Sequence, residues 1–324
     1  MAAVDVLPAR SREVVNARFA DRFEVVHADR GDVGCRVEIA RSADVILAGW
    51  TAVEAAVIET ASRCRVIQKL GVGVDKIDVA AAQRRGIPVL CAAGINADAV
   101  AEMTVLLILA VVRRLRWAAE ELRAGRFQKE ALRVSTFQLT GRTAGLVGAG
   151  HIGRAVARRL APFGVRVVYY DIRRLPSEIE RDLGVSYLPL DELVATSDIV
   201  SLHLPSTPET RGMFDADRFA KMKPGAIFIN TARGALVDEH ALIDAVRRGI
   251  VLGAGLDVTA EEPLPPTSPL LRLENVLVTP HMAGVVADNF PRVIEHAYRN
   301  VTAVLSGAAV PDEDIVFWPP APTR

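Results

Sequence analysis

The stretch that decides the fold reads TAGLVGAGHIGRAVARRLAPFGVRVVYYD, from Thr143 to Asp171. A short apolar run over 144–147 leads into GAGHIG at 148–153. A helical pattern with one apolar face follows, and a second apolar run over 165–170 ends at Asp171. This order of strand, glycine turn, helix, strand and acid predicts a βαβ unit that binds a dinucleotide.

The three glycines of the turn meet different requirements of such a unit. Gly148 permits the tight turn, Gly150 lets the backbone approach a pyrophosphate, and Gly153 lets the helix pack closely on the sheet. The pyrophosphate would bind the free N–H groups where His151 and Ile152 begin the helix, at the positive end of its dipole.

Asp171 stands at the end of the second strand, where a carboxylate accepts hydrogen bonds from ribose hydroxyls and repels a 2′-phosphate. NAD is therefore the expected cofactor. Arg173 and Arg174 follow this acid, and an arginine here is able to accommodate the 2′-phosphate of NADP. NADP stays open as an alternative.

The composition is that of a globular protein with two cores. The chain has 324 residues, half of them hydrophobic, with 39 basic and 39 acidic residues, so no net charge favours nucleic acid or an anionic membrane. The longest apolar run, 103–112, is too short to cross a bilayer. Cys35, Cys64 and Cys91 show no metal-ligand spacing, and the N-terminus lacks the apolar core of a secretion signal. We expect a cytoplasmic protein without a metal site.

Strand-like and helix-like patterns alternate along the chain, which predicts parallel sheets covered by helices on both faces. We expect an α/β protein of two Rossmann- or flavodoxin-like doubly wound domains. Residues 1–97 with 288–324 would bind substrate, and residues 98–287 would bind NAD. Because ligands of open parallel sheets bind beyond the carboxyl ends of the strands, the active site is expected in a cleft between the domains.

Two connecting segments carry further expectations. Residues 97–123 form one long helical pattern with an apolar middle, and residues 126–140 show no regular pattern. All-round hydrophobicity of a helix predicts burial against a second subunit as well as its own chain. The Pro-rich tail with Phe317 and Trp318 is expected either to dock or to fray.

Three polar residues follow predicted strands of the second domain: Arg233, Glu262 and His281. Each has an ordinary structural explanation, yet together they suit hydride transfer to a 2-keto acid. A histidine titrates near neutral pH and is able to protonate the carbonyl oxygen, and a neighbouring glutamate stabilises the imidazolium form. An arginine holds a carboxylate with its fork of N–H groups. In the first domain, the glycine-rich turn after Leu70 is either a cradle for a carboxylate or a plain strand-to-helix turn.

At this point the chain resembles the D-isomer-specific 2-hydroxyacid dehydrogenases over nearly its whole length. The resemblance rests on an ordered series of motifs: GVGVD (71–75), Asn96 with VAE (100–102), GAGHIG (148–153) with Asp171, HLPSTPETRG (203–212), MKPGAIFINTARG (222–234), GLDVTAEEP (255–263) and TPHMAG (279–284). It implies a catalytic triad of Arg233, Glu262 and His281, a cofactor carrying the hydride, and a homodimer that pairs through the cofactor domain.

The resemblance also implies the remaining site residues. The backbone N–H groups of Val72 and Gly73 would meet the substrate carboxylate, with Leu70, Trp50 and Asn96 completing the substrate set. Beyond the glycine turn, Asp171 and Arg173, the residues expected along the cofactor are Thr104, His203, Pro205, Thr210, Thr231, Ala232, Asp257 and Gly284.

The substrate stays open between several readings. Glu262 argues against formate dehydrogenases, which carry glutamine there. Trp50 stands where phosphoglycerate-type members tend to have a basic residue, so it favours an unphosphorylated 2-keto acid such as glyoxylate or hydroxypyruvate. Lys69 keeps D-3-phosphoglycerate dehydrogenase as an alternative, and Val285 replaces a small polar residue near the nicotinamide. A dinucleotide-sensing, corepressor-like binding protein is the alternative from another class, because such proteins also keep the triad.

Overall fold

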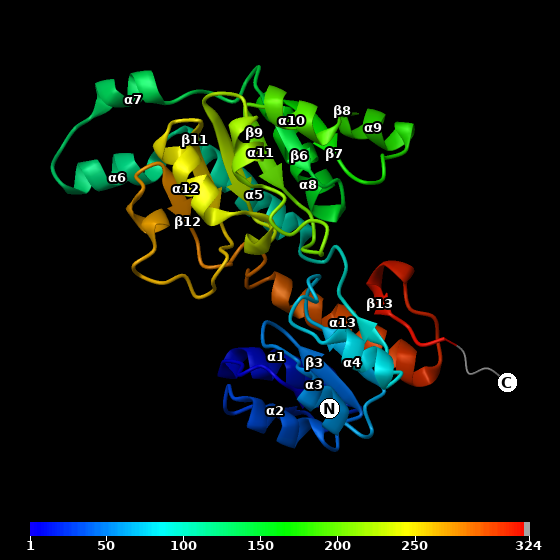
Figure 1. The fold of residues 1–324 in the computed structure, drawn as a ribbon. Coiled ribbons are helices and arrows are strands. Elements are labelled where there is room, and N and C mark those ends of the chain that lie inside the picture. Colours follow the sequence, from blue (N-terminus) through cyan, green and yellow to red (C-terminus); the bar gives the residue numbers. More distant parts are fainter. Residues whose placement is uncertain (321–324) are drawn as a thin grey trace. The chain divides into compact units, whose positions relative to one another are not determined.

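A computed structural model describes residues 1–320 of the chain, which divides into two compact units (Figure 1). Unit 1 comprises Met1–Asn96 with the chain from Ala287 onward, and unit 2 comprises Ala97–Val286. Each unit is a doubly wound α/β sheet, so the predicted fold class is confirmed.

Unit 1 contains a six-stranded sheet in the order β13-β5-β4-β3-β1-β2. Without β13, this is the 2-1-3-4-5 order of flavodoxin-like folds. Its parallel strands are β1 (Ala2–Ala3), β2 (Val26–His27), β3 (Val45–Ala48), β4 (Val66–Lys69) and β5 (Val89–Leu90). Its helices are α1 (Ala9–Phe19), α2 (Val33–Ala40), α3 (Ala55–Thr60), α4 (Val79–Arg84) and α13 (Asn289–Ser306).

Helices cover both faces of this sheet, because each face carries its own apolar cluster. Residues of α1 and α13, such as Phe19 and Ile294, pack with Leu47 and Leu90 on one face. Residues of α2, α3 and α4 pack on the other. Parallel strands buried on both faces need this double cover.

The C-terminal segment includes a further strand. Residues Ile315–Phe317 form strand β13, which pairs antiparallel with β5. Phe317 packs partly against the apolar cluster formed with α2, α3 and α4, whereas Trp318 is exposed. The sequence pattern did not predict this strand, and its antiparallel pairing departs from the purely parallel sheet expected.

Unit 2 contains a seven-stranded parallel sheet in the order β12-β11-β10-β9-β6-β7-β8. The first six strands in chain order follow the 3-2-1-4-5-6 arrangement of dinucleotide-binding domains. The strands are β6 (Thr143–Val147), β7 (Arg166–Tyr170), β8 (Val185–Tyr187), β9 (Ile199–Leu202), β10 (Ala226–Asn230), β11 (Val251–Leu256) and β12 (Val276–Val278). The helices are α5 (Ala97–Val112), α6 (Leu115–Arg123), α7 (Lys129–Ser135), α8 (His151–Leu160), α9 (Ser177–Leu183), α10 (Leu190–Thr196), α11 (Ala216–Ala220) and α12 (Glu239–Arg247).

Alternate residues of these strands face two separate cores. Phe228 and Leu202 pack with α10, α11 and α12. Ile227 and Ile199 pack with α5, α8 and α9 on the opposite face. The topological switch point lies between β6 and β9, where the chain order reverses, and ligands of such sheets bind beyond the carboxyl ends there.

The segment 97–140 differs from its expectation in two ways. The single helix predicted over 97–123 is broken, because Arg114 adopts a left-handed conformation (φ +49°) between α5 and α6. The segment 126–140, expected to be irregular, contains helix α7. In Figure 1, α6 and α7 lie at the periphery of unit 2, outside the helices that cover the sheet, and neither helix contains a buried residue. None of the helices within residues 1–320 has the length and apolar composition needed to cross a membrane.

Candidate functional site

The glycine turn after β6 has the shape that a dinucleotide requires. Gly148 has φ +110°, and a Cβ there would lie 2.6 Å from the carbonyl oxygen of His203. A Cβ on Gly153 would collide with the carbonyl oxygen of Gly148, so the helix approaches the turn too closely for any side chain. A Cβ on Gly150 would instead meet open space.

Gly150 is also the N-cap of α8, and no side chain caps this helix. Gly150 has no side chain that could cover the first turn of α8, which begins at His151 and Ile152. Ile152 packs partly into the core beneath. This arrangement fits the pyrophosphate of a dinucleotide.

The carboxylate of Asp171 is fixed at the tip of β7. Its Oδ2 accepts a hydrogen bond from the N–H of Ala149 at 2.8 Å, and its Oδ1 accepts one from the N–H of Arg173 at 3.2 Å. Asp171 is half-buried and so retains an accessible edge. It ties the glycine turn to the second strand and leaves acceptor capacity for ribose hydroxyls.

His203 follows β9 and lies against the same glycine turn. Its Nε2 is 3.0 Å from the hydroxyl of Ser201, while its Nδ1 is buried without a hydrogen-bond partner among the described residues. Burial lowers the pKa of His203 to about 3, so its ring is neutral at physiological pH. The buried, unsatisfied nitrogen is consistent with a polar group of a ligand beside this turn.

The neighbouring residues Pro205 and Thr210 shape a loop. The Thr210 hydroxyl donates to the carbonyl oxygen of Pro205 at 2.8 Å and accepts from the N–H of Thr207 at 2.8 Å. These bonds fix the loop after β9, which predicts a supporting role for Thr210 beside any direct contact with a ligand.

Arg233, Glu262 and His281 follow β10, β11 and β12, which are neighbours in the sheet. The structure brings Glu262 and His281 into contact, with Nδ1 of His281 2.9 Å from Oε2 of Glu262. The side chain of His281 is 48% exposed and that of Glu262 is 29% exposed, so the pair is open to a ligand. A carboxylate at Nδ1 leaves Nε2 as the nitrogen that meets a substrate.

Arg233 is held in a loop against the loop of Glu262. The side-chain amide of Asn230 donates to the carbonyl oxygen of Arg233 at 2.9 Å, and its oxygen accepts from the N–H of Ala232 at 3.0 Å. Gly234 packs directly on the carbonyl group of Thr259, where a Cβ would collide. Arg233 itself is half-buried.

Asp257 fixes the loop that carries His281. Its buried carboxylate accepts from the hydroxyl of Thr279 at 2.6 Å and from the N–H groups of Met282 and Ala283 at 2.9 and 2.8 Å. Its carbonyl oxygen accepts the N–H of His281 at 2.7 Å. Asp257, which was predicted to lie along the cofactor, therefore also holds the loop of His281 in place.

These bonds hold His281 in a left-handed conformation with φ +51°. For a residue other than glycine this conformation costs roughly 1–3 kcal/mol, and it persists only where surrounding contacts impose it. Strain of this kind, on a partly exposed histidine beside a glutamate, is typical of a functional position.

Other predicted cofactor residues lie around this edge of the sheet. The hydroxyls of Thr104 in α5 and Thr231 after β10 are 2.9 Å apart, and Thr104 is fully buried. Thr104 therefore supports Thr231. Gly284 is half-buried at the end of the His281 loop.

The predicted substrate residues lie in unit 1, at the carboxyl ends of its strands. Leu70, Val72 and Gly73 follow β4, and Val72 is exposed. Asn96 ends the first segment of the unit, and its buried Oδ1 has no hydrogen-bond partner in the described chain.

Trp50 lies in a loop after β3 that sequence analysis did not connect to Asp5. The buried carboxylate of Asp5 accepts hydrogen bonds from the N–H groups of Gly49, Trp50 (2.9 Å) and Thr51 (2.7 Å). The Trp50 side chain remains exposed. Only the folded loop reveals Asp5 as its support, because the two segments are far apart in the chain.

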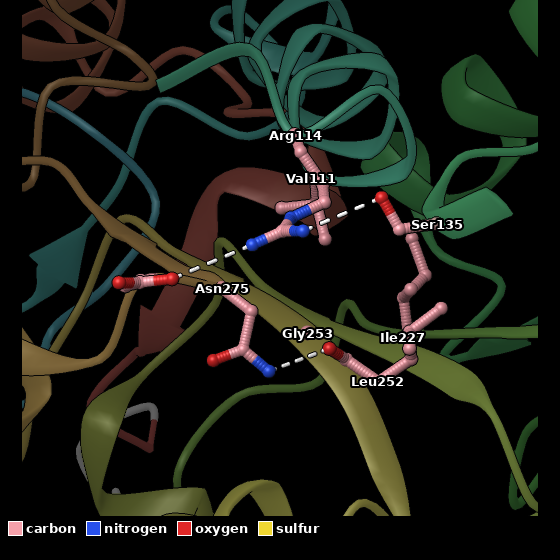
Figure 2. Close-up of a pocket in the computed structure, with 8 residues that line it drawn as sticks. Val111, Arg114, Ser135, Ile227, Leu252, Gly253 and Asn275 are labelled. Carbon is pink, nitrogen blue, oxygen red and sulfur yellow. Dashed lines mark hydrogen bonds and ion pairs between the residues drawn. The ribbon is translucent and has the colours of Figure 1, made fainter. Parts of the chain in front are cut away.

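A cavity of about 190 Å³ lies elsewhere in unit 2 (Figure 2). Arg114 crosses it, with Nη1 3.3 Å from the Ser135 hydroxyl and Nη2 3.5 Å from the Glu274 carboxylate. Leu252 and Asn275 also line it. Leu252 and Asn275 stand at the amino ends of β11 and β12, whereas His281 follows the carboxyl end of β12, so this cavity lies at the other edge of the sheet from the His281–Glu262 pair. Within residues 1–320, no group of three or more His, Cys, Asp or Glu side chains is placed to hold a metal ion.

The fold and the glycine turn together define a dinucleotide-binding α/β protein with a His–Glu pair at its strand ends. Residues 105–283 match the family model of the D-isomer specific 2-hydroxyacid dehydrogenase NAD binding domain. The chain belongs to this family. Its predicted class, an NAD(P)-dependent D-2-hydroxyacid dehydrogenase, is confirmed by this match.

Three known proteins illustrate the likeness. A glyoxylate reductase of Thermofilum pendens is 42% identical over 89% of this chain and 86% of its own length. A D-3-phosphoglycerate dehydrogenase of Mycobacterium leprae is 40% identical over 91% of this chain, but the match spans only 56% of that relative. The structure of a D-lactate dehydrogenase from Aquifex aeolicus, complexed with NAD and lactic acid, is 28% identical, with a TM-score of 0.87 over 98% of this chain and 99% of that one.

Proposed function

We propose that this enzyme reduces a small 2-keto acid to the D-2-hydroxy acid, with glyoxylate and hydroxypyruvate as the best substrates. The observation that carries the proposal is the contact between His281 and Glu262 at the strand ends of an NAD-binding domain. A His–carboxylate pair beside a nicotinamide site supplies the proton that carbonyl reduction needs.

His281 acts as the general acid of reduction and the general base of oxidation. Glu262 accepts the Nδ1–H bond, which orients the ring and leaves Nε2 to face the substrate. The proton therefore leaves from Nε2 toward the carbonyl oxygen of the substrate. The braced loop around Asp257 keeps this nitrogen in place during turnover.

Arg233 binds the substrate carboxylate through its guanidinium fork and polarises the adjacent carbonyl group. The N–H groups of Val72 and Gly73 are further proposed donors to the substrate carboxylate. Asn230 and Gly234 position Arg233 through the backbone. Trp50 and Asn96 contribute to the substrate pocket.

The cofactor in this proposal is NAD, held by the glycine turn at its pyrophosphate and by Asp171 at its ribose. Bound NADH supplies the hydride, and the chain's own residues orient the substrate and deliver the proton. Thr231, Asp257 and Gly284 are proposed to lie along the nicotinamide half.

The choice of glyoxylate or hydroxypyruvate rests on the 42% identical glyoxylate reductase and on Trp50. An exposed indole in the substrate loop gives no positive charge to a phosphate. D-3-phosphoglycerate dehydrogenase is the second candidate, favoured by Lys69 and by the 40% identical M. leprae relative. The match spans 56% of that relative's length.

The decisive experiment follows NADH oxidation with glyoxylate, hydroxypyruvate, pyruvate, phenylpyruvate, 2-ketoglutarate and 3-phosphohydroxypyruvate. We expect the highest kcat/KM with glyoxylate and hydroxypyruvate. Activity confined to the phosphorylated compound would establish the second candidate. Tight NADH binding without turnover of any compound would favour the sensor class instead.

We further propose a homodimer that pairs through α6, α7 and the loop between them, the segment we call the arm (residues 115–135). The arm buries none of its helical residues, and its apolar side chains Leu122, Phe127 and Val134 are 65%, 83% and 87% exposed. A second copy of the chain would cover them. The free thiols of Cys35, Cys64 and Cys91 support the proposed cytoplasmic location.

A further inference from the structure

The loop between β7 and α9 carries two arginines shortly after Asp171, Arg173 and Arg174. Their side chains have different surroundings. Arg173 donates its backbone N–H to Asp171, and its side chain is exposed. Arg174 turns its guanidinium to α9, where Nε and Nη2 donate to the two oxygens of Glu180 at 2.9 and 3.0 Å. This is the parallel fork geometry that guanidinium groups also use toward phosphate.

Glu180 is fixed by more than this ion pair. The hydroxyl of Tyr169 donates to Oε1 of Glu180 at 2.7 Å and accepts the N–H of Leu175 at 2.8 Å. Tyr169 is buried in β7, two residues before Asp171. Burial and the neighbouring Glu180 raise the pKa of Tyr169 to about 12, so its hydroxyl keeps the proton that it donates.

Arg174 and Glu180 differ in how far they are exposed to solvent. The Glu180 side chain is 12% exposed, whereas that of Arg174 is 64% exposed. Hydrogen bonds from Arg174 and Tyr169 lower the pKa of Glu180, so it stays ionised. The guanidinium carbon of Arg174 also lies 5.6 Å from the ring centroid of Tyr187. The carboxylate is therefore the anchored member, and the arginine is the member able to move.

We propose that Glu180 is a specificity-determining residue that retains Arg174 and thereby keeps the chain selective for NAD over NADP. Asp171 repels a 2′-phosphate directly, and Glu180 occupies the fork of the arginine that would otherwise bind it. The inference rests on the proposed function, since it concerns the same dinucleotide site.

The test measures dissociation constants for NADH and NADPH by quenching of protein fluorescence, without substrate. In Glu180→Gln the amide loses the negative charge and one acceptor oxygen, so Arg174 is released. We expect the NADPH to NADH ratio of dissociation constants to fall about fivefold, because exposed ion pairs of this kind are individually modest. Adding Arg174→Ala to this variant should restore the wild-type ratio.

Two further variants test whether a change in the ratio of dissociation constants comes from the release of Arg174 or merely from the loss of a negative charge on α9. Glu178→Gln removes the same charge from the same helix at an exposed position, and it should leave the ratio unchanged. Arg174→Ala in the otherwise wild-type chain should also leave it unchanged, and this surface substitution is available even if Glu180→Gln lowers stability.

Three results would overturn the inference: an unchanged ratio in Glu180→Gln, an equal shift in Glu178→Gln, or a raised ratio in Arg174→Ala alone. NADH binding with any of these leaves the proposed function standing. If the wild-type chain bound neither dinucleotide, the proposed function would fail together with this inference.

Discussion

His281 is the residue in which strain, exposure and a charged partner coincide. Asparagine tolerates the left-handed conformation better than most residues, so His281→Asn keeps the loop while removing the acid–base group. We expect kcat to fall by about a hundredfold or more, as general acid–base catalysis contributes on that order. NADH binding, measured by fluorescence, should be unchanged.

The matched control for this prediction is His240→Asn, which alters an exposed histidine at the start of α12. Its kcat should equal that of the wild type. A His281→Asn enzyme with near-normal kcat would refute the assignment of the proton donor.

His203 gives a prediction about stability and pH. Burial lowers its pKa to about 3, whereas the unfolded chain has a histidine pKa of about 6.5. Between these values the unfolded state binds one more proton, so stability is lost as the pH falls below about 6.5. His203→Gln should remove this loss, which is at most about 2 kcal/mol between about pH 7.5 and pH 5.

Urea unfolding of the wild type, His203→Gln and the exposed control His240→Gln at both pH values checks this expectation. The free energy of unfolding of His203→Gln should depend less on pH than that of the wild type or of His240→Gln. Equal pH dependence in all three would mean that His203 is protonated normally in the folded state.

At this scale the sequence indicated which residues would follow the strands, but not what holds them. Asp257, Asn230 and Asp5 each bind backbone groups of a loop that carries a candidate site residue. These bonds depend on the path of the loop, which local propensities do not determine. No sequence motif distinguishes a residue that supports a loop in this way from one that contacts the cofactor directly.

At the scale of elements, the glycine turn and α8 yield a contrast between two glycines. A methyl group on Gly150 meets open space, so Gly150→Ala should fold normally, yet it would occupy the region where the pyrophosphate binds. A methyl group on Gly153 collides with the carbonyl oxygen of Gly148 and should lower the free energy of unfolding by roughly 1–3 kcal/mol.

Thermal unfolding and NADH titration of both variants distinguish these effects. We expect Gly150→Ala to retain the wild-type melting temperature and to weaken NADH binding at least about tenfold, the equivalent of about 1.4 kcal/mol. Normal NADH binding by Gly150→Ala would show that the dinucleotide does not approach this glycine.

Elements with a clear period were predictable, and elements that depend on distant partners were not. Strands β6 and β7 begin within one residue of the predicted apolar runs over 144–147 and 165–170 and end with them, because apolar runs and flanking turn residues define such strands. The break between α5 and α6 was missed, since Arg114 adopts a positive φ without being glycine. Strand β13 was missed because only pairing with β5 makes this short segment a strand.

At the scale of the whole molecule, the arm provides the test of assembly. An apolar side chain that is exposed in the single chain costs little to replace, so Leu122→Glu should fold with an unchanged melting temperature. In a dimer the same carboxylate would be buried without a partner charge, which is strongly unfavourable. We therefore expect the wild type to sediment at twice the mass of the chain and Leu122→Glu to sediment at the mass of one chain, at micromolar concentration.

Ile172→Glu is the matched control, because Ile172 is equally apolar, 85% exposed and outside the arm. This variant should sediment as the wild type does. If the wild type sedimented at the mass of one chain, the homodimer would be excluded, and the apolar arm would need another partner. If Leu122→Glu remained dimeric while the control did too, the two copies would have to pair through a different surface, and the arm would lose its proposed role.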